Sequence, residues 1–136
     1  MDRITKELRS KIMSRVRTKD TAPELIVRRT LHAMGYRYRL HVKTLPGTPD
    51  IVFRMRKKAI FVHGCFWHGH DCRRGQSPKT NEEFWHSKIA KNRARDNQAC
   101  RALEEQGWQV LIVWQCEIKD LAILQDRLQK FLEHSA

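Results

Sequence analysis

The residues best suited to chemistry are an aspartate and a histidine-rich loop that follows it after one predicted hairpin. Asp50 comes after a Pro-Gly-Thr-Pro turn, and the loop reads His63-Gly-Cys-Phe-Trp-His-Gly-His-Asp-Cys72. Phosphodiester cleavage needs a metal ion, an acid that holds the metal, and a group that takes a proton from water. Asp50 and the loop contain these groups. The Pro-Asp pair alone is weak evidence, since many such aspartates cap turns.

Four other side chains have the chemistry of zinc ligands. The pair His70-x-Cys72 offers two ligands at close spacing. Cys116, at the end of an apolar strand, can add a third, and Asp96 on a long helix is the best-placed acid for a fourth. A mixed His, Cys, Cys and Asp set suits tetrahedral zinc. Because the spacing matches no common zinc finger, ordinary buried thiols remain the alternative, and the other two cysteines are interpreted as structural.

Two large aromatic residues, Phe66 and Trp67, occur in the same polar loop. Such side chains can wedge between base pairs, which costs a few kcal/mol per unstacked step but lets the DNA bend. Trp85, near the start of the long helix, can join them. A hydrophobic minicore around the zinc is the alternative, and local pattern favours it for Trp85. Trp108 and Trp114 are expected in the core.

The N-terminal half of the chain predicts helices followed by a hairpin. A basic amphipathic helix over about residues 4–17 either lies on DNA or is simply solvated. Thr21-Ala-Pro-Glu24 has the pattern of a capping box, which by itself explains Glu24, and the helix it opens runs to Met34. Apolar and basic residues alternate over 36–43, which predicts a strand. A turn at 45–49 precedes a hairpin of 50–55 and 58–63, which places Asp50 across from Val62 and His63.

The C-terminal half predicts a second α/β segment. A helix begins near Asn81 and ends before Gly107, the apolar run 108–114 predicts a buried central strand, and a last helix spans about residues 120–133. The predicted order is therefore α, α, β, β, β, α, β, α. This order indicates an α/β sandwich with polar residues at the strand ends.

Size and charge narrow the function classes. The 136 residues fit one domain, and a net charge of +12 favours nucleic acid as the partner. No apolar run approaches the roughly 20 residues of a membrane span, and no helix pairs a basic face with a broad apolar one. The charged N-terminus is unlike a secretory signal, so we expect a cytoplasmic protein in which cysteines bind metal or stay free.

At these residues the chain resembles the very-short-patch-repair (Vsr) mismatch endonucleases of bacteria. The similarity covers most of the chain in order, through TAPE at 21–24, LPGTPD at 45–50, IFVHGCFWH at 60–68, the His70-x-Cys72 pair, EFWHSKIAKN at 83–92 and GWQVLIVWQC at 107–116. The resemblance implies one nuclease domain over 1–136 with a restriction-endonuclease-like fold. That fold is related to the PD-(D/E)XK nucleases and is a mixed sheet flanked by helices, here with a structural zinc site.

The resemblance also implies roles for individual residues. Asp50 and the backbone carbonyl of Val62 would bind Mg²⁺; the family usually has threonine at 62, and valine keeps that carbonyl. His68 would activate water, with His63 and Glu24 assisting at the phosphate. The implied zinc ligands are His70, Cys72, Asp96 and Cys116. The implied intercalating residues are Phe66, Trp67 and Trp85, while the basic segment 1–19 would contact DNA.

The implied activity is a Mg²⁺-dependent nick 5′ to the thymine of a T:G mismatch, which starts very short patch repair of deaminated 5-methylcytosine. The expected partner is mismatched duplex DNA, with repair-pathway proteins as further candidates. We expect a monomer associated with the bacterial nucleoid, since an asymmetric mismatch does not call for a two-fold dimer. The alternatives are a restriction-type nuclease on unmismatched sites and a non-catalytic, zinc-stabilised DNA-binding module. A redox role ranks last, because no C-x-x-C motif is present.

Overall fold

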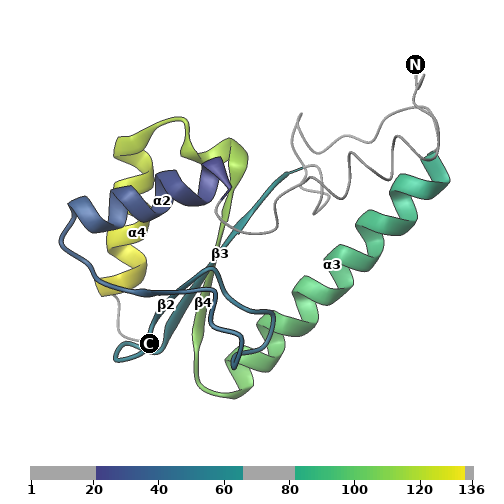
Figure 1. Ribbon diagram of the computed structural model, residues 1–136, viewed down its shortest axis with the longest axis horizontal. Coiled ribbons are helices and arrows are strands. Elements are labelled where there is room, and N and C mark those ends of the chain that lie inside the picture. Colours follow the sequence, from purple (N-terminus) through teal and green to yellow (C-terminus); the bar gives the residue numbers. More distant parts are fainter. Residues whose placement is uncertain (1–20, 66–81, 134–136) are drawn as a thin grey trace.

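The computed structural model describes residues 21–65 and 82–133 as a four-stranded sheet between helices (Figure 1). Helices α2 and α4 cover one side of the sheet, and α3 covers the other. The elements in chain order are α2 (Ala22–Ala33), β1 (Arg39–Leu40), β2 (Ile51–Phe53), β3 (Lys58–His63), α3 (Glu82–Glu105), β4 (Gln109–Trp114), the 3-10 helix η2 (Gln115–Ile118) and α4 (Leu121–Glu133). The sheet order is β1-β2-β3-β4, antiparallel except for the parallel pair β3–β4. The predicted mixed α/β fold and the predicted order of its described elements are confirmed.

Two apolar cores fix the sheet between its helical layers. The larger core joins α2 and α4 to one sheet face through Val27, Leu31, Leu124, Leu128, Leu132, Ile51, Phe53, Ile60 and Val113. The smaller core joins α3 to the other face through Ala59, Phe61, Ala99 and Leu103. Successive β3 residues alternate between the two cores, as strand geometry requires. Two neighbouring residues at the end of β3 therefore serve opposite sides of the molecule.

Helix α2 begins as predicted but uses only half of the capping box. The Thr21 hydroxyl accepts a hydrogen bond from the backbone N–H of Glu24 (3.4 Å), and proline occupies the first turn. The Glu24 carboxylate bonds to side chains of other elements, as described below. The capping pattern thus located the helix correctly and assigned the Glu24 side chain wrongly.

The strand predicted over 36–43 is much shorter than expected. Tyr36, Tyr38 and Leu40 pack against the larger core as the alternation requires, and the arginines between them are exposed. The regular pattern ends at His41, whose φ is +47°. That left-handed residue turns the chain, so β1 covers only Arg39–Leu40.

The hairpin turn is longer than the predicted Arg56-Lys57 turn, which shifts the register. The N–H of Lys57 bonds to the Arg54 carbonyl (3.2 Å), and Lys57 adopts a φ of +54°. Ile51 pairs with Ile60, and continuing this register by one residue places Asp50 opposite Phe61. The expectation that Asp50 lies across from Val62 and His63 was therefore wrong in register. Asp50 reaches Val62 through its side chain instead.

The apolar strand β4 was predicted to be central, and this was wrong. Within the described part of the chain β4 is the last strand of the sheet, and only Val113 in it is fully buried. β3 is the central, nearly continuously buried strand. Helices on both faces of the sheet explain why the β4 sequence is apolar, because face coverage demands apolar residues even in a terminal strand.

Lysine 58 lies at the end of β3 remote from His63. Its ammonium group donates to the carbonyls of Phe131 (2.5 Å) and Leu132 (3.0 Å) in the last turn of α4. This buried cation therefore satisfies helix-end carbonyls, as expected near the negative end of a helix dipole. It takes no part in the site described next.

Candidate metal centre

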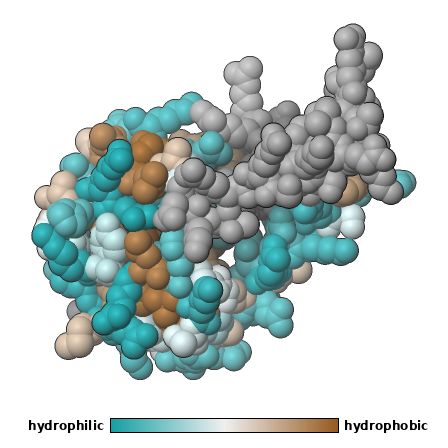
Figure 2. All heavy atoms as spheres, in the orientation of Figure 1, coloured by the Kyte–Doolittle hydropathy of each residue, from teal (hydrophilic) through white to brown (hydrophobic). Residues whose placement is uncertain are grey.

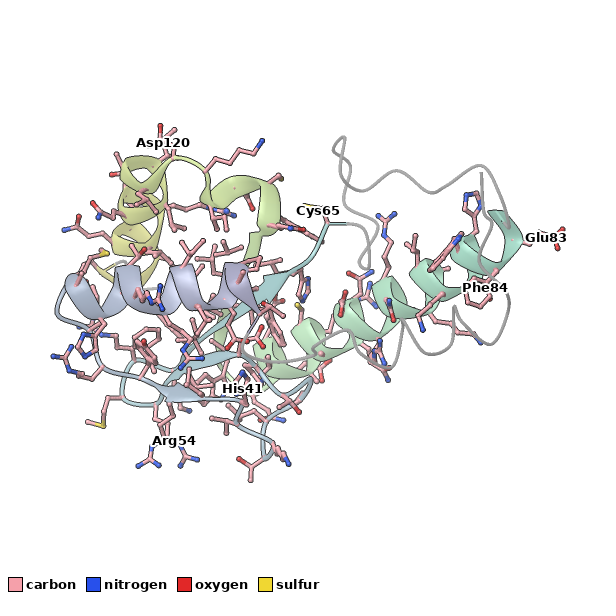
Figure 3. The ribbon with its side chains drawn as sticks, turned by 45° about the horizontal axis from the view of Figure 1, so that its top comes forward. His41, Arg54, Cys65, Glu83, Phe84 and Asp120 are labelled. Atoms are coloured by element: carbon pink, nitrogen blue, oxygen red, sulfur yellow. The ribbon has the colours of Figure 1, made fainter. Side chains whose placement is uncertain are left out.

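Three side chains from separate elements meet beside the first turn of α2. Glu24 comes from that turn, His41 follows β1, and Asp50 precedes β2. One ligand atom of each lies within 4.8 Å of the others, and no other such group of three occurs in residues 21–65 and 82–133. Figure 3 shows His41 close to the N-terminal end of α2. We call Glu24, His41 and Asp50 the carboxylate cluster.

Asp50 is held in a fixed orientation by the neighbouring strand. Its Oδ2 accepts a hydrogen bond from the backbone N–H of Val62 (2.8 Å), and its Oδ1 lies 4.0 Å from Nε2 of His41. Burial raises the pKa of Asp50 to about 7; the Val62 N–H and His41 oppose the rise, and the Glu24 carboxylate adds to it. A carboxyl group with this environment is poised to bind a cation, which would favour its ionised form.

The turn before Asp50 is pressed against α3. Gly47 has a φ of +75°, and a Cβ added there would lie 2.5 Å from the Cβ of Ala99 and 3.2 Å from the Phe61 ring. Only glycine combines this conformation with such a close approach. Helix α3 therefore supports the loop that presents Asp50.

Glu24 is almost fully buried, with 2% of its surface exposed. Both carboxylate oxygens lie 3.0 Å from Nε2 of His41, and Oε2 accepts a hydrogen bond from Arg28 at 3.2 Å. A buried carboxylate requires such partners, because burying an uncompensated charge is costly. Glu24 is thus tied to the cluster by its side chain and to helix capping only by its backbone N–H.

His41 is the member of the cluster that sequence reasoning missed. Alternation placed it on the outer, basic face of a strand, but its left-handed backbone turns the imidazole toward Glu24. This conformation costs a non-glycine residue about 1 kcal/mol or more. The alternation of apolar and basic residues over 36–43 contains no signal for this left-handed turn. Its proximity to the LPGTPD turn was the only available hint.

Val62 and His63 separate to the two faces of the sheet. Val62 packs against the larger core and uses its N–H to hold Asp50. His63 is 5% exposed and lies on the α3 side, with its Nδ1 3.9 Å from Oδ2 of Asp96. Its ring makes an edge contact with Trp114, with 5.2 Å between ring centroids. The described contacts therefore associate His63 with Asp96 rather than with the carboxylate cluster.

Two of the four predicted zinc ligands lie in the described residues. Asp96 is on α3, and half-buried Cys116 is in η2, immediately after β4. The turn η2 is fixed by Glu117, whose carboxylate accepts bonds from the N–H of Trp114 (2.8 Å) and from Arg127. His70 and Cys72 lie outside the described residues. The predicted zinc site therefore stays a prediction.

The predicted water-activating and intercalating residues are mostly outside the described part of the chain. This applies to Phe66, Trp67 and His68, and to the basic segment 1–19. Trp85 is described: it lies in the first turn of α3, half-buried, with its ring 4.9 Å from that of exposed Phe84. Figure 3 shows Phe84 near the end of α3 that is remote from the carboxylate cluster.

The cluster and the fold together define a class of protein. A mixed α/β sheet that gathers two carboxylates and an imidazole in a largely buried site provides oxygen and nitrogen ligands for a divalent cation. Such a site is typical of a metal-dependent hydrolase.

Comparisons with known proteins identify the family. A family model described as DNA mismatch endonuclease Vsr matches residues 1–74. The chain is 54% identical over 134 residues to the type II nicking enzyme V.XorIIP of Xanthomonas oryzae pv. oryzae. The aligned region covers 98% of each of the two chains. It is 43% identical over 121 residues to the DNA mismatch endonuclease Vsr of Escherichia coli. This aligned region covers 89% of this chain and 78% of the relative. The chain belongs to the Vsr family of DNA mismatch endonucleases and is an endonuclease, a hydrolase that acts on DNA. Among its described helices, none is long and apolar enough to cross a membrane.

Proposed function

We propose that this endonuclease nicks duplex DNA on the 5′ side of the thymine of a T:G mismatch in a Mg²⁺-dependent reaction. The nick would initiate very short patch repair of deaminated 5-methylcytosine. The observation that carries the proposal is the meeting of buried Glu24 and Asp50 in one cluster, in a chain of the Vsr family. The names of its relatives, a mismatch endonuclease and nicking enzymes, agree with it.

The carboxylate cluster fits a divalent metal ion. Two largely buried carboxylates repel each other when both are ionised, and the raised pKa of Asp50 reflects its burial together with this neighbour. A bound cation would offset both effects. Mg²⁺ prefers oxygen ligands, so Asp50 and the backbone carbonyl of Val62 would hold it. When bound, the metal would stabilise negative charge that develops at the phosphate.

The histidines and Glu24 would supply proton transfer and the contacts to the phosphate. His68 would take the proton from the attacking water, with His63 and Glu24 assisting at the phosphate. The contacts of His63 with Asp96 and Trp114 support a fixed ring orientation. Glu24 lies at the N-terminal turn of α2, where the helix dipole favours an anion and, by the same field, an approaching phosphate.

A structural zinc ion would join the loop after β3 to the other elements. His70, Cys72, Asp96 and Cys116 form a set that suits tetrahedral zinc. The anchoring of η2 through Glu117 and Arg127 supports this role for Cys116, because metal ligands need a fixed backbone. The zinc would hold the loop that contains His68 close to the sheet.

DNA would be bound by basic side chains on both flanks of the sheet. Exposed arginines and lysines occur around α2, β1 and the hairpin and along α3, namely Arg29, Arg37, Arg39, Lys43, Arg54, Lys57, Lys91, Arg93, Arg95 and Arg101. In the single view of Figure 2, hydrophilic side chains cover most of the described surface. Phe66, Trp67 and Trp85 would test how readily a base step opens, which costs less at a T:G wobble pair. We expect the segment 1–19 to contact the duplex and the protein to act as a monomer.

A nicking assay on labelled duplexes tests this function. The duplexes differ only by T:G against T:A, with varied flanking bases, and are incubated with and without Mg²⁺. We expect Mg²⁺-dependent nicking of the thymine strand in T:G duplexes alone. Equal cutting of T:A duplexes would instead indicate a restriction-type nuclease. Binding without cutting would indicate a zinc-stabilised DNA-binding module.

A further inference from the structure

We infer that His41 is a positioning residue of the metal centre, which holds the Glu24 carboxylate against Asp50 and thereby sets the affinity for the divalent cation. This inference rests on the proposed function, because it concerns the same site. It assigns a role to a residue that the motifs of the chain leave without one. His41 acts on the metal through Glu24.

His41 is connected to both carboxylate residues at once. Its Nε2 lies 3.0 Å from each Glu24 oxygen and 4.0 Å from Oδ1 of Asp50. Its backbone N–H donates to the Asp50 carbonyl at 3.1 Å. The imidazole is therefore fixed relative to Asp50 by the main chain and relative to Glu24 by the side chain.

Glu24 has a competing partner that would draw it elsewhere. Arg28, one turn along α2, bonds to Oε2 at 3.2 Å and is itself partly exposed. Without the imidazole, Arg28 would compete with the hydrogen bond that joins Glu24 to Asp50. The distance between the two carboxylates therefore depends on His41. The negative charge of Glu24 stabilises a cation held by Asp50 only while the two carboxylates stay close together.

The backbone supports the same assignment independently. His41 has a φ of +47°, a conformation that histidine adopts at a cost and that the surrounding structure must maintain. An extended backbone at this position would point the imidazole outward beside exposed Arg39. Strained non-glycine residues concentrate at functional sites, and here the strain has a visible result, since it delivers Nε2 to Glu24.

The test compares two substitutions of His41. They separate tolerance of the left-handed backbone conformation from the ability of the side chain to contact Glu24. Asparagine tolerates the left-handed conformation but is too short to reach Glu24, so H41N removes the contact and spares the fold. Glutamine can place an amide donor near the position of Nε2, so H41Q preserves the contact. H32N is the matched control, because His32 is an exposed histidine on α2 outside the cluster. Asp50→Ala serves as the reference for loss of the site.

Binding of Mn²⁺ to the full-length protein is measured from the free-ion electron paramagnetic resonance signal, with Mg²⁺ as competitor. We expect H41N to weaken binding about 10- to 100-fold, as loss of outer-shell partners does at metal sites. H41Q should stay within about threefold of the wild type, and H32N should be unchanged. Urea unfolding of the metal-free variants checks that H41N keeps its fold.

The outcomes separate this inference from the function it rests on. Wild-type binding by H41N, together with lost binding in Asp50→Ala, would overturn the role of His41 and leave the metal site intact. Equal losses in H41N and H41Q would mean that the histidine nitrogen itself binds the metal, which also overturns positioning through Glu24. Absence of saturable binding in the wild type would remove the proposed metal site and this inference together.

Discussion

The two faces of the sheet carry different chemistry within one residue of each other. On the α2 side, the carboxylate cluster presents oxygen ligands, and the Val62 N–H orients Asp50. On the α3 side, His63 lies beside Asp96 and Trp114. Trp114 comes two positions before Cys116 in the sequence. We call His63 and Asp96 the α3-side pair. Successive side chains point to opposite faces, so a single strand end serves both the carboxylate cluster and the α3-side pair.

The largest expected effect is on the nicking rate, and it comes from a substitution in the carboxylate cluster alone. Asp50→Ala should lower the nicking rate by about a thousandfold or more, because a metal that stabilises the phosphate contributes several kcal/mol. DNA affinity, measured by fluorescence anisotropy, and zinc content should not change. Asp126→Ala, which removes an exposed acid of α4, is the control. Substantial nicking by Asp50→Ala would exclude Asp50 from the mechanism.

A second substitution tests the proposed zinc site. Cys116→Ser should lose zinc and lower the free energy of unfolding by about 3 kcal/mol or more, because structural zinc contributes directly to folding. Zinc is measured by mass spectrometry and stability by urea unfolding. Cys100→Ser, at a half-buried thiol of α3, should retain the metal. A wild-type protein purified without zinc would end this prediction.

A pH series sharpens the difference between the proposed magnesium site and the proposed zinc site. The folded pKa of Asp50 is about 7 against an ordinary value of 3.8, so the carboxyl group must lose a proton before it binds Mg²⁺. Mg²⁺ affinity should therefore be about 30-fold weaker at pH 5.5 than at pH 8. The contribution of protonated Asp50 to metal-free stability is complete below pH 3.8 and is lost as the pH rises through about 7.

Thermal unfolding with increasing Mg²⁺ measures this dependence at each pH. Asp50→Asn cannot ionise at this position, so its stability should lack the decline between pH 4 and pH 8. A wild-type Mg²⁺ midpoint that does not vary with pH would show that Asp50 does not control binding.

The smallest effect concerns mismatch preference. Trp67→Ala should lower the ratio of T:G to T:A binding about tenfold, because stacking on a base contributes about 1–3 kcal/mol. Affinity for matched DNA should fall less. Met55→Ala, at a fully exposed position of the hairpin turn, provides the control. Equal losses on matched and mismatched duplexes would contradict a wedging role.

Sequence patterns predicted the elements of this fold well because their signals are local. Thr21 and Pro23 located the start of α2, and Gly107 located the end of α3. The hairpin strands were recognised by the turn before them and by the turn between them. The motif around Asp50 also led to a residue that lies in a group of side chains able to hold a metal ion.

The errors of the sequence analysis arose where tertiary contacts decide the outcome. Alternation assumes a continuous extended backbone, so it placed His41 outward and could not anticipate its left-handed turn. A capping box explained Glu24 locally, although a histidine 17 positions away binds its carboxylate. The apolar β4 looked central because the number of neighbouring strands leaves no mark on composition.

The pairing of the strands has a consequence for the order of folding. β2 and β3 pair through a short hairpin, whereas Lys58 of β3 pairs with Gln109 of β4, roughly 50 residues away, across the whole of α3. Local contacts close with little loss of chain entropy, and distant parallel pairing closes late. We expect the hairpin that presents Asp50 to belong to the folding nucleus and β4 to dock afterwards. A chain that stops before this docking would already hold Asp50, the proposed magnesium ligand, in place, while Cys116 would not yet have reached its final position.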